Sequence, residues 1–257
     1  MIRLIASDID GTLLHGEQTQ IDPAVFQEIR RLRKKGILFC PASGRQYGSL
    51  RRLFAPVAEE LSYLCENGAV VYGPGAPGPV LGKTAMDRTL ALELCQEILD
   101  APECEVLISG ANTSYLCPKQ PDIVDLIRYI VGNHTTVIPS PPAVPEDIVK
   151  VSAYCRQGAQ AVQPQLAPKW QAHFNAAIAG EKWLDFTLAD KGTGLRQLCA
   201  ALGIGLDEVM AFGDNYNDLP MLEAVGWPYI MDNAAQELRR RFPNHCRRVE
   251  DVLKTIE

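Results

Sequence analysis

The chain has 257 residues, a formal net charge of −6 and a hydrophobic content of 47%, with 22% charged residues. These values are typical of a globular protein with a substantial core and exclude a disordered chain. The acidic balance lacks the basic surface that nucleic-acid binding needs, and no apolar run approaches the ~18 residues of a membrane span. An acidic protein of this kind needs concentrated positive charge or a metal ion to bind an anionic substrate.

The eight cysteines are scattered through the chain, and most of them lie in apolar runs without a CxxC pair. This pattern predicts buried, reduced thiols, with disulfides or a zinc site as the less favoured alternatives. The four histidines show no metal-ligand spacing. The N-terminal apolar segment is too short for the core of a signal peptide and runs straight into acidic residues. We therefore expect a cytoplasmic protein.

The first 40 residues predict a strand, a helix and a second strand. An apolar run over 3–7 ends in an acidic turn. Asp22 is a suitable N-cap with Pro23 in the first helical position, and an apolar stripe follows with a spacing of three to four residues. A second apolar run covers 37–40. A strand, helix and strand in this order predict a βαβ unit and a parallel sheet.

The next segment predicts a strand over 63–66 and a hairpin of strands over 69–72 and 79–81. The hairpin turn, 73–78, matches the GxGxxG pattern of dinucleotide-binding loops. We reject that function because no helix follows and because its prolines remove amide donors that phosphates need. We expect a loop tip.

The pattern changes from residue 84 to 187, where helices and strands alternate irregularly around a proline-rich connection at 139–145. The predicted helices cover 89–99 and 122–131, and the predicted strands cover 106–108, 114–117, 148–155, 173–178 and 183–188. This stretch predicts an inserted α+β domain.

The alternation of strands and helices resumes after the insert. Leucines 195, 198 and 202 form a helical stripe, the predicted strands cover 209–213 and 228–231, and the predicted helices cover 234–242 and 249–256. The fold class is therefore α/β, with a doubly wound parallel-sheet core over 1–83 and 188–257 and an inserted α+β domain over 84–187.

Polar loops follow three of the predicted core strands, at 8–14, 41–45 and 213–218. Ligand sites in open α/β sheets form at the carboxyl ends of strands, where all three loops should lie. Clustered carboxylates repel one another unless a cation lies among them, and hard oxygen ligands select Mg²⁺. The alternative is a set of solvated turns, since Asp-Gly is common in turns. Two acidic loops are expected at the carboxyl ends of strands in the same sheet, and this shared location favours a metal site over solvated turns.

These loops resemble the motifs of the haloacid dehalogenase superfamily. Asp8–Leu14, with the sequence Asp-Ile-Asp-Gly-Thr-Leu-Leu, resembles motif I, and Ser43–Arg45 resembles motif II of the Cof-like subgroup, which carries a large α/β cap. Lys191-Gly192 resembles motif III, and Gly213–Asp218 resembles motif IV. Met231–Ala234 also resembles this subgroup. The motifs occur in family order along nearly the whole chain.

The resemblance implies a phosphatase with an aspartyl-phosphate intermediate. Asp8 is then the nucleophile, and Asp10 is the acid that protonates the leaving oxygen and the base that activates water. Thr12 is expected to hydrogen-bond Asp10 or nearby backbone. Ser43 is expected to donate to a phosphoryl oxygen, and Lys191 to neutralise charge on the phosphoryl group and the nucleophile.

The resemblance also implies the cofactor Mg²⁺, held by the carboxylate of Asp8, the backbone carbonyl of Asp10 and the carboxylate of Asp214. Asn217 and Asp218 are expected to anchor the loop, Lys191 and the metal shell, with Asn217 also among the phosphate-binding residues.

Smaller roles remain open from the sequence. The amide of Gly44 is expected to help Ser43 bind phosphate. The alternative for Ser43 is a role in a simple turn, and the alternative for Thr12 is a role as a turn cap. Arg45 has two equal alternatives, which are to orient substrate or to pair with a carboxylate. Asn67-Gly68 fits a subgroup pattern but is also a common turn.

The inserted domain resembles a cap that selects substrate and excludes water. Its candidate specificity residues are Asn112, Tyr115, Lys150 and His173. The implied partner is a small phosphate ester such as a sugar phosphate, with no nucleic acid or membrane and an unknown oligomeric state. The alternatives are a phosphotransferase or phosphomutase of the same superfamily, a phosphorylated signalling receiver and a binding protein with a degenerate site.

Overall fold

The computed structural model describes residues 1–179 and 181–257, which divide into two compact units. Unit 1 contains residues 1–82 and 190–257, and unit 2 contains residues 83–189. Among the described residues, no helix is both long enough and apolar enough to cross a membrane.

Unit 1 contains the following strands and helices in chain order: β1 (Leu4–Ser7), α1 (Pro23–Arg33), β2 (Leu38–Pro41), α2 (Tyr47–Leu53), β3 (Tyr63–Cys65), β4 (Val70–Tyr72), β5 (Val80–Lys83), α6 (Lys191–Leu202), β12 (Val209–Gly213), α7 (Leu219–Leu222), β13 (Trp227–Met231), α8 (Gln236–Arg239), β14 (His245–Cys246) and α9 (Val249–Lys254). Short 3-10 turns cover Ala55–Val57, Glu66–Gly68, Leu206–Glu208 and Tyr216–Asp218.

The main sheet of unit 1 has the strand order β14-β13-β12-β1-β2, and its described strand pairs are all parallel. From β1 the chain moves outward to β2, and from β12 it moves outward in the other direction to β13 and β14. The direction of winding therefore reverses between β1 and β12, which is where open α/β sheets bind ligands.

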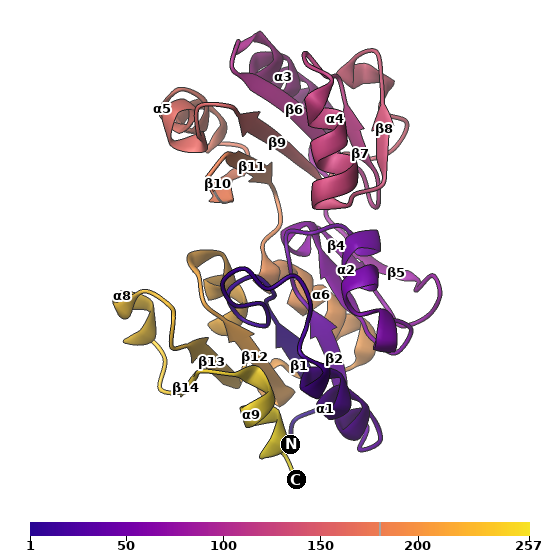
Figure 1. The fold of residues 1–257 in the computed structure, drawn as a ribbon, viewed down its shortest axis with the longest axis vertical. Helices are drawn as coiled ribbons and strands as arrows, with labels where there is room; N and C mark the ends of the chain where they lie inside the picture. Colours follow the sequence, from indigo (N-terminus) through magenta and orange to yellow (C-terminus); the bar gives the residue numbers. More distant parts are fainter. Residues whose placement is uncertain (180) are drawn as a thin grey trace. The chain divides into compact units, whose positions relative to one another are not determined.

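Both faces of β1 are buried, as expected for a central parallel strand. Leu4 and Ala6 belong to a core cluster that includes Leu195 and Leu198 of α6, while Ile5, which points the other way, is also fully buried. Helices α1 and α9 pack against each other. Figure 1 shows them in front of the sheet with α6 behind it, so helices cover both faces.

A smaller sheet with the order β3-β4-β5 completes unit 1. Its strands β4 and β5 are the predicted hairpin, and the glycine-rich segment 73–78 is the loop that joins them. An isolated parallel bridge between Ala42 and Leu64 links the loop after β2 to β3.

Unit 2 contains the following strands and helices: α3 (Arg88–Asp100), β6 (Cys104–Ser109), β7 (Ser114–Leu116), α4 (Asp122–Asp125), a π-helical turn (Leu126–Val131), β8 (Thr135–Val137), a 3-10 turn (Pro141–Ala143), β9 (Lys150–Cys155), α5 (Ala159–Trp170), β10 (Asn175–Ala179) and β11 (Trp183–Thr187). The strands form one sheet with the order β10-β11-β9-β6-β7-β8.

The sheet of unit 2 is antiparallel except for the β7–β8 pair. One face carries the main apolar core of this unit, which includes residues of α3 and α5. A smaller cluster packs Leu107 and Leu116 against Ile123 and Ile127. Unit 2 is thus an α+β insert in a doubly wound α/β chain, and the predicted fold class is confirmed.

In the described part of the chain, five helices and strands were not predicted from the sequence, namely α2, β8, α5, α7 and β14. Helix α5 contains Pro164 and Pro168, each of which removes a backbone donor and argues against a helix on local grounds. The predicted helix over 234–242 is also shorter in the structure, where α8 covers only Gln236–Arg239.

Candidate active site

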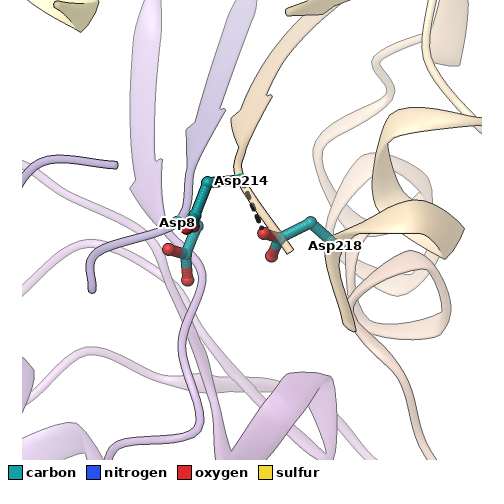
Figure 2. A group of neighbouring side chains, drawn as sticks. All are labelled: Asp8, Asp214 and Asp218. Atoms are coloured by element: carbon teal, nitrogen blue, oxygen red, sulfur yellow. Dashed lines mark hydrogen bonds between the residues drawn. The ribbon is translucent and has the colours of Figure 1, made fainter. Parts of the chain in front are cut away.

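The two acidic loops meet at the switch point of the main sheet. Asp8 directly follows β1, and Asp214 directly follows β12. The strands are in register with Ser7 opposite Phe212, and the Asp8 amide donates to the Phe212 carbonyl at 2.9 Å. Figure 2 shows the side chains that result from this pairing, together with Asp218 from the turn that follows β12.

Asp8, Asp214 and Asp218 form a compact group of acids. One carboxylate oxygen from each lies within 4.8 Å of the others. Burial raises the pKa of Asp8 to about 7, with the charges of Asp218 and Asp214 adding to this effect and Lys191 opposing it. Burial also raises the pKa of Asp214, again helped by the charge of Asp218. Three acids share one lysine, so the donor set fits a hard divalent cation.

Lys191 supplies the positive charge of this group. It is the first residue of α6, whose N-cap Asp190 accepts from the Thr193 amide at 2.6 Å. Its side chain is 1% exposed, and its ammonium group donates to Asp8 at 2.5 Å and to Asp218 at 2.6 Å. Burial alone would lower the pKa of Lys191, but the two carboxylates outweigh it and hold that pKa above its usual range. The lysine is therefore charged.

Asp218 fixes the loop after β12. Its side chain is fully buried, and while one oxygen accepts from Lys191, the other accepts from the amides of Asp214 and Asn215 at 3.0 Å each. These bonds occupy both of its oxygens and tie Asp218 to the loop backbone and to Lys191. Asn217 lies exposed in the same turn, so the loop-anchoring contacts come from Asp218 rather than from Asn217.

Thr12 contacts a different partner from the one expected. Its hydroxyl donates to a carboxylate oxygen of Asp214 at 3.2 Å rather than to Asp10. The side-chain amide of Asn233 donates to the other oxygen of Asp214 at 3.3 Å and to the Gly11 carbonyl at 2.9 Å. Asp214 is thus oriented through both oxygens by the β1 loop and by the loop after β13.

Asp10 lies apart from the three acids. Its side chain is 58% exposed and is bound by Arg45, whose Nε and terminal nitrogen donate to the two carboxylate oxygens at 3.1 and 2.6 Å. The sequence left two alternatives open for Arg45, and in the structure Arg45 pairs with a carboxylate, that of Asp10.

Ser43 lies in the loop after β2 and is buried. Its amide donates to the Leu64 carbonyl at 3.0 Å, and its hydroxyl oxygen accepts from the Arg45 amide at 3.3 Å. This is the turn contact expected of a serine here. Because the oxygen acts as acceptor, the hydroxyl proton stays available for a further acceptor. Gly44 packs against Asn67, where an added Cβ would lie 3.2 Å from the side-chain oxygen.

Residues 5–251 match the haloacid dehalogenase-like hydrolase family. The chain belongs to this family. This confirms the resemblance drawn from the four motifs, and with it the prediction of an enzyme.

Individual relatives of this haloacid dehalogenase-like hydrolase cover almost all of the chain. It is 28% identical to the 5-amino-6-(5-phospho-D-ribitylamino)uracil phosphatase YbjI of Escherichia coli, over 91% of this chain and 86% of that protein. It is 25% identical to the HMP-PP phosphatase of Citrobacter koseri, over 96% of this chain and 92% of that protein. A crystal structure from Eubacterium rectale superposes with a TM-score of 0.88 at 31% identity, covering 100% of this chain and 99% of that one.

Asn233 is the residue of the hydrolase site that sequence reasoning did not assign. The sequence of its segment, Met231–Ala234, resembles that of the Cof-like subgroup. That resemblance does not indicate that the side-chain amide of Asn233 contacts Asp214, which lies 19 positions earlier in the chain.

Two of the candidate specificity residues have partners inside unit 2. Lys150 forms an ion pair with Asp185 at 3.6 Å, and the Tyr115 hydroxyl donates to Glu146 at 2.6 Å.

Proposed function

We propose that the chain is a magnesium-dependent phosphomonoester hydrolase that forms a covalent phosphate intermediate on Asp8. The observation that supports this most directly is the buried Asp8 carboxylate, bound to the ammonium group of Lys191 and placed beside Asp214 at the switch point of the sheet. The positive charge of Lys191 favours the ionised form of this carboxylate, which is the form that attacks phosphorus, and its burial shields it from water.

In the first step, a carboxylate oxygen of Asp8 attacks the phosphorus atom of the ester. The bond between phosphorus and the ester oxygen breaks, and Asp10 gives its proton to that oxygen, so the organic product leaves as an alcohol. Lys191 stays charged beside Asp8 and stabilises the negative charge of the transferring group.

In the second step, water attacks the phosphorus atom of the aspartyl-phosphate. Asp10, now ionised, takes the proton from this water, and the bond between phosphorus and Asp8 breaks. Inorganic phosphate leaves, while Asp8 returns as a carboxylate and Asp10 as the acid. The exposed position of Asp10 is consistent with a side chain that reaches both the leaving oxygen and solvent water.

The metal proposed for this site is Mg²⁺, with the carboxylates of Asp8 and Asp214 and the backbone carbonyl of Asp10 as protein ligands. When bound, the ion supplies positive charge that relieves carboxylate repulsion and neutralises phosphoryl oxygens. Thr12 and Asn233 orient Asp214 for this role, and Asp218 holds the loop that carries it. Ser43, Gly44 and Asn217 are the remaining phosphate-binding candidates.

The proposed substrate is a small phosphorylated metabolite, with a sugar phosphate as the expected class, and unit 2 is proposed as the cap that selects it. Both curated relatives named above are phosphatases of small phosphorylated compounds. Their names differ in the organic group, so the relatives support the reaction more strongly than any one substrate.

Phosphate release from a panel of small phosphate esters, with Mg²⁺ or with excess chelator, tests this function. We expect release that the chelator abolishes and that added Mg²⁺ restores. Release that persists in chelator would contradict the metal role. Phosphorylated acceptors in place of free phosphate would show a transferase instead.

A further inference from the structure

Arg45 binds the acid and base candidate Asp10 through both carboxylate oxygens, at 2.6 and 3.1 Å. Two parallel bonds from a planar guanidinium fix the direction of a carboxylate as well as its position. The two side chains are 34% and 58% exposed, so this pair adds little to folding stability. Its effect lies in the orientation of Asp10.

The backbones on both sides of this pair are fixed. Asp10 forms a bridge with Leu14, and the Gly11 amide donates to the Leu14 carbonyl at 2.8 Å. On the other side, the Arg45 amide donates to the Ser43 hydroxyl at 3.3 Å, and the Arg45 carbonyl accepts from the Glu66 amide at 3.1 Å. The side-chain torsions of Asp10 are therefore its main remaining freedom, and Arg45 restricts them.

We propose that Arg45 is a positioning residue that holds the Asp10 carboxylate in the orientation needed for proton transfer. This inference rests on the proposed function, because it gives Arg45 a role only through Asp10. An unrestrained, exposed carboxylate populates several rotamers, and each one that points elsewhere lowers the fraction of enzyme ready for proton transfer.

The competing role for Arg45 is direct contact with the substrate. The two roles differ in how the loss of Arg45 combines with the loss of Asp10. If Arg45 acts through Asp10, it has no further effect once the carboxyl group is gone, whereas a substrate contact would persist without Asp10.

The test is a double-mutant cycle of Arg45→Ala, Asp10→Asn and the combined variant, with Arg241→Ala as a matched control. Arg241 pairs with Glu223 on the surface of the same unit. We measure kcat and KM on an alkyl phosphate, glycerol phosphate, and on 4-nitrophenyl phosphate, whose leaving group departs without a proton. Thermal unfolding of each variant checks folding.

We expect Arg45→Ala to lower kcat on glycerol phosphate by about 10- to 100-fold with little change in KM. The combined variant should be no slower than Asp10→Asn alone, and Arg241→Ala should match wild type. On 4-nitrophenyl phosphate, Arg45→Ala should release a rapid first equivalent of 4-nitrophenolate before slow turnover, because only the second step then needs Asp10. Arg45→Lys keeps the charge without the two-pronged geometry and should fall between wild type and Arg45→Ala.

A rise in KM for Arg45→Ala, or losses that multiply in the combined variant, would assign Arg45 to the substrate and overturn the inference. If Arg45→Ala does not fold, the same cycle with Arg45→Lys decides between the roles. No phosphate release from wild type on either ester would instead count against the proposed function, so the two failures are distinguishable.

Discussion

The ammonium group of Lys191 donates to the carboxylate of Asp8 at 2.5 Å although the two residues lie 183 positions apart. Unit 2 occupies most of the intervening sequence, and the chain returns to unit 1 directly before this lysine. The N-cap Asp190 begins α6 at that point and fixes Lys191 in its first turn. The contact places a positive charge at the proposed nucleophile, and the first two predictions follow from it.

Replacing Asp8 with asparagine should abolish turnover without unfolding the protein. The amide is nearly the same size as the carboxylate and still accepts from Lys191, but it is not a nucleophile. We expect kcat to fall by about a thousandfold or more. The free energy of unfolding, measured in urea without metal, should stay equal or rise because the variant removes one of three mutually repelling acids. Turnover near the wild-type rate would rule out Asp8 as nucleophile.

Replacing Lys191 with methionine should destabilise the protein. Methionine fills a similar volume but leaves the buried carboxylates of Asp8 and Asp218 without their cation, and breaking a buried ion pair costs about 3–5 kcal/mol. The measurement is urea unfolding in metal-free buffer. Lys254→Met is the control, since Lys254 pairs with Asp251 on the surface and its loss should change stability by less than about 0.5 kcal/mol. Equal effects of both substitutions would contradict the buried role of Lys191.

Replacing Gly11 with alanine should damage the site, whereas the same change at Gly16 should not. Gly11 has a φ of +97°, and an added Cβ would collide with the carboxylate of Asp214. Gly16 has a φ of +59° with open space around it, so alanine there should cost only about 1 kcal/mol of backbone strain. We expect Gly11→Ala to lower both stability and kcat, and Gly16→Ala to keep wild-type kcat. Unchanged activity in Gly11→Ala would show that the loop tolerates a shift of Asp214.

Mg²⁺ should raise the thermal unfolding midpoint of the protein through Asp214. A ligand at 100 times its dissociation constant stabilises the folded state by about 2.7 kcal/mol. Asp214→Asn should lose most of this increase because it removes a proposed ligand. The exposed acid Asp251 provides the control, and Asp251→Asn should respond to Mg²⁺ as wild type does. Equal midpoint shifts in wild type and Asp214→Asn would place the ion elsewhere.

The strands and loops around the site were predictable because each rests on a local signal. The apolar runs before Asp8 and before Asp214 directly predict buried strands. Acidic residues at the carboxyl ends of parallel strands indicate that these residues lie at the same edge of the sheet. The cap at Asp22 and the proline after it marked the start of α1, which begins at that proline. Such signals are short and need no knowledge of the tertiary structure.

The partners of individual side chains were not predictable to the same degree. Thr12 was expected near Asp10 because the two are close in sequence, but the parallel pairing of β1 with β12 brings Asp214 to it instead. Asn233 reaches the same carboxylate from the loop after β13. Helix α5 forms despite two prolines because Leu166 and Trp170 are buried in the core of unit 2. Tertiary packing decides these features.

Chemical trapping of the phosphorylated intermediate is the direct test of whether Asp8 is the nucleophile. Wild-type protein is mixed with a ³²P-labelled ester that it hydrolyses, quenched rapidly in acid and digested, and the labelled peptide is sequenced. We expect label on the peptide that contains Asp8, in a linkage that hydroxylamine cleaves, and no label in Asp8→Asn. Phosphate release by wild type with no labelled protein at any quench time, or with the label on another residue, would contradict it.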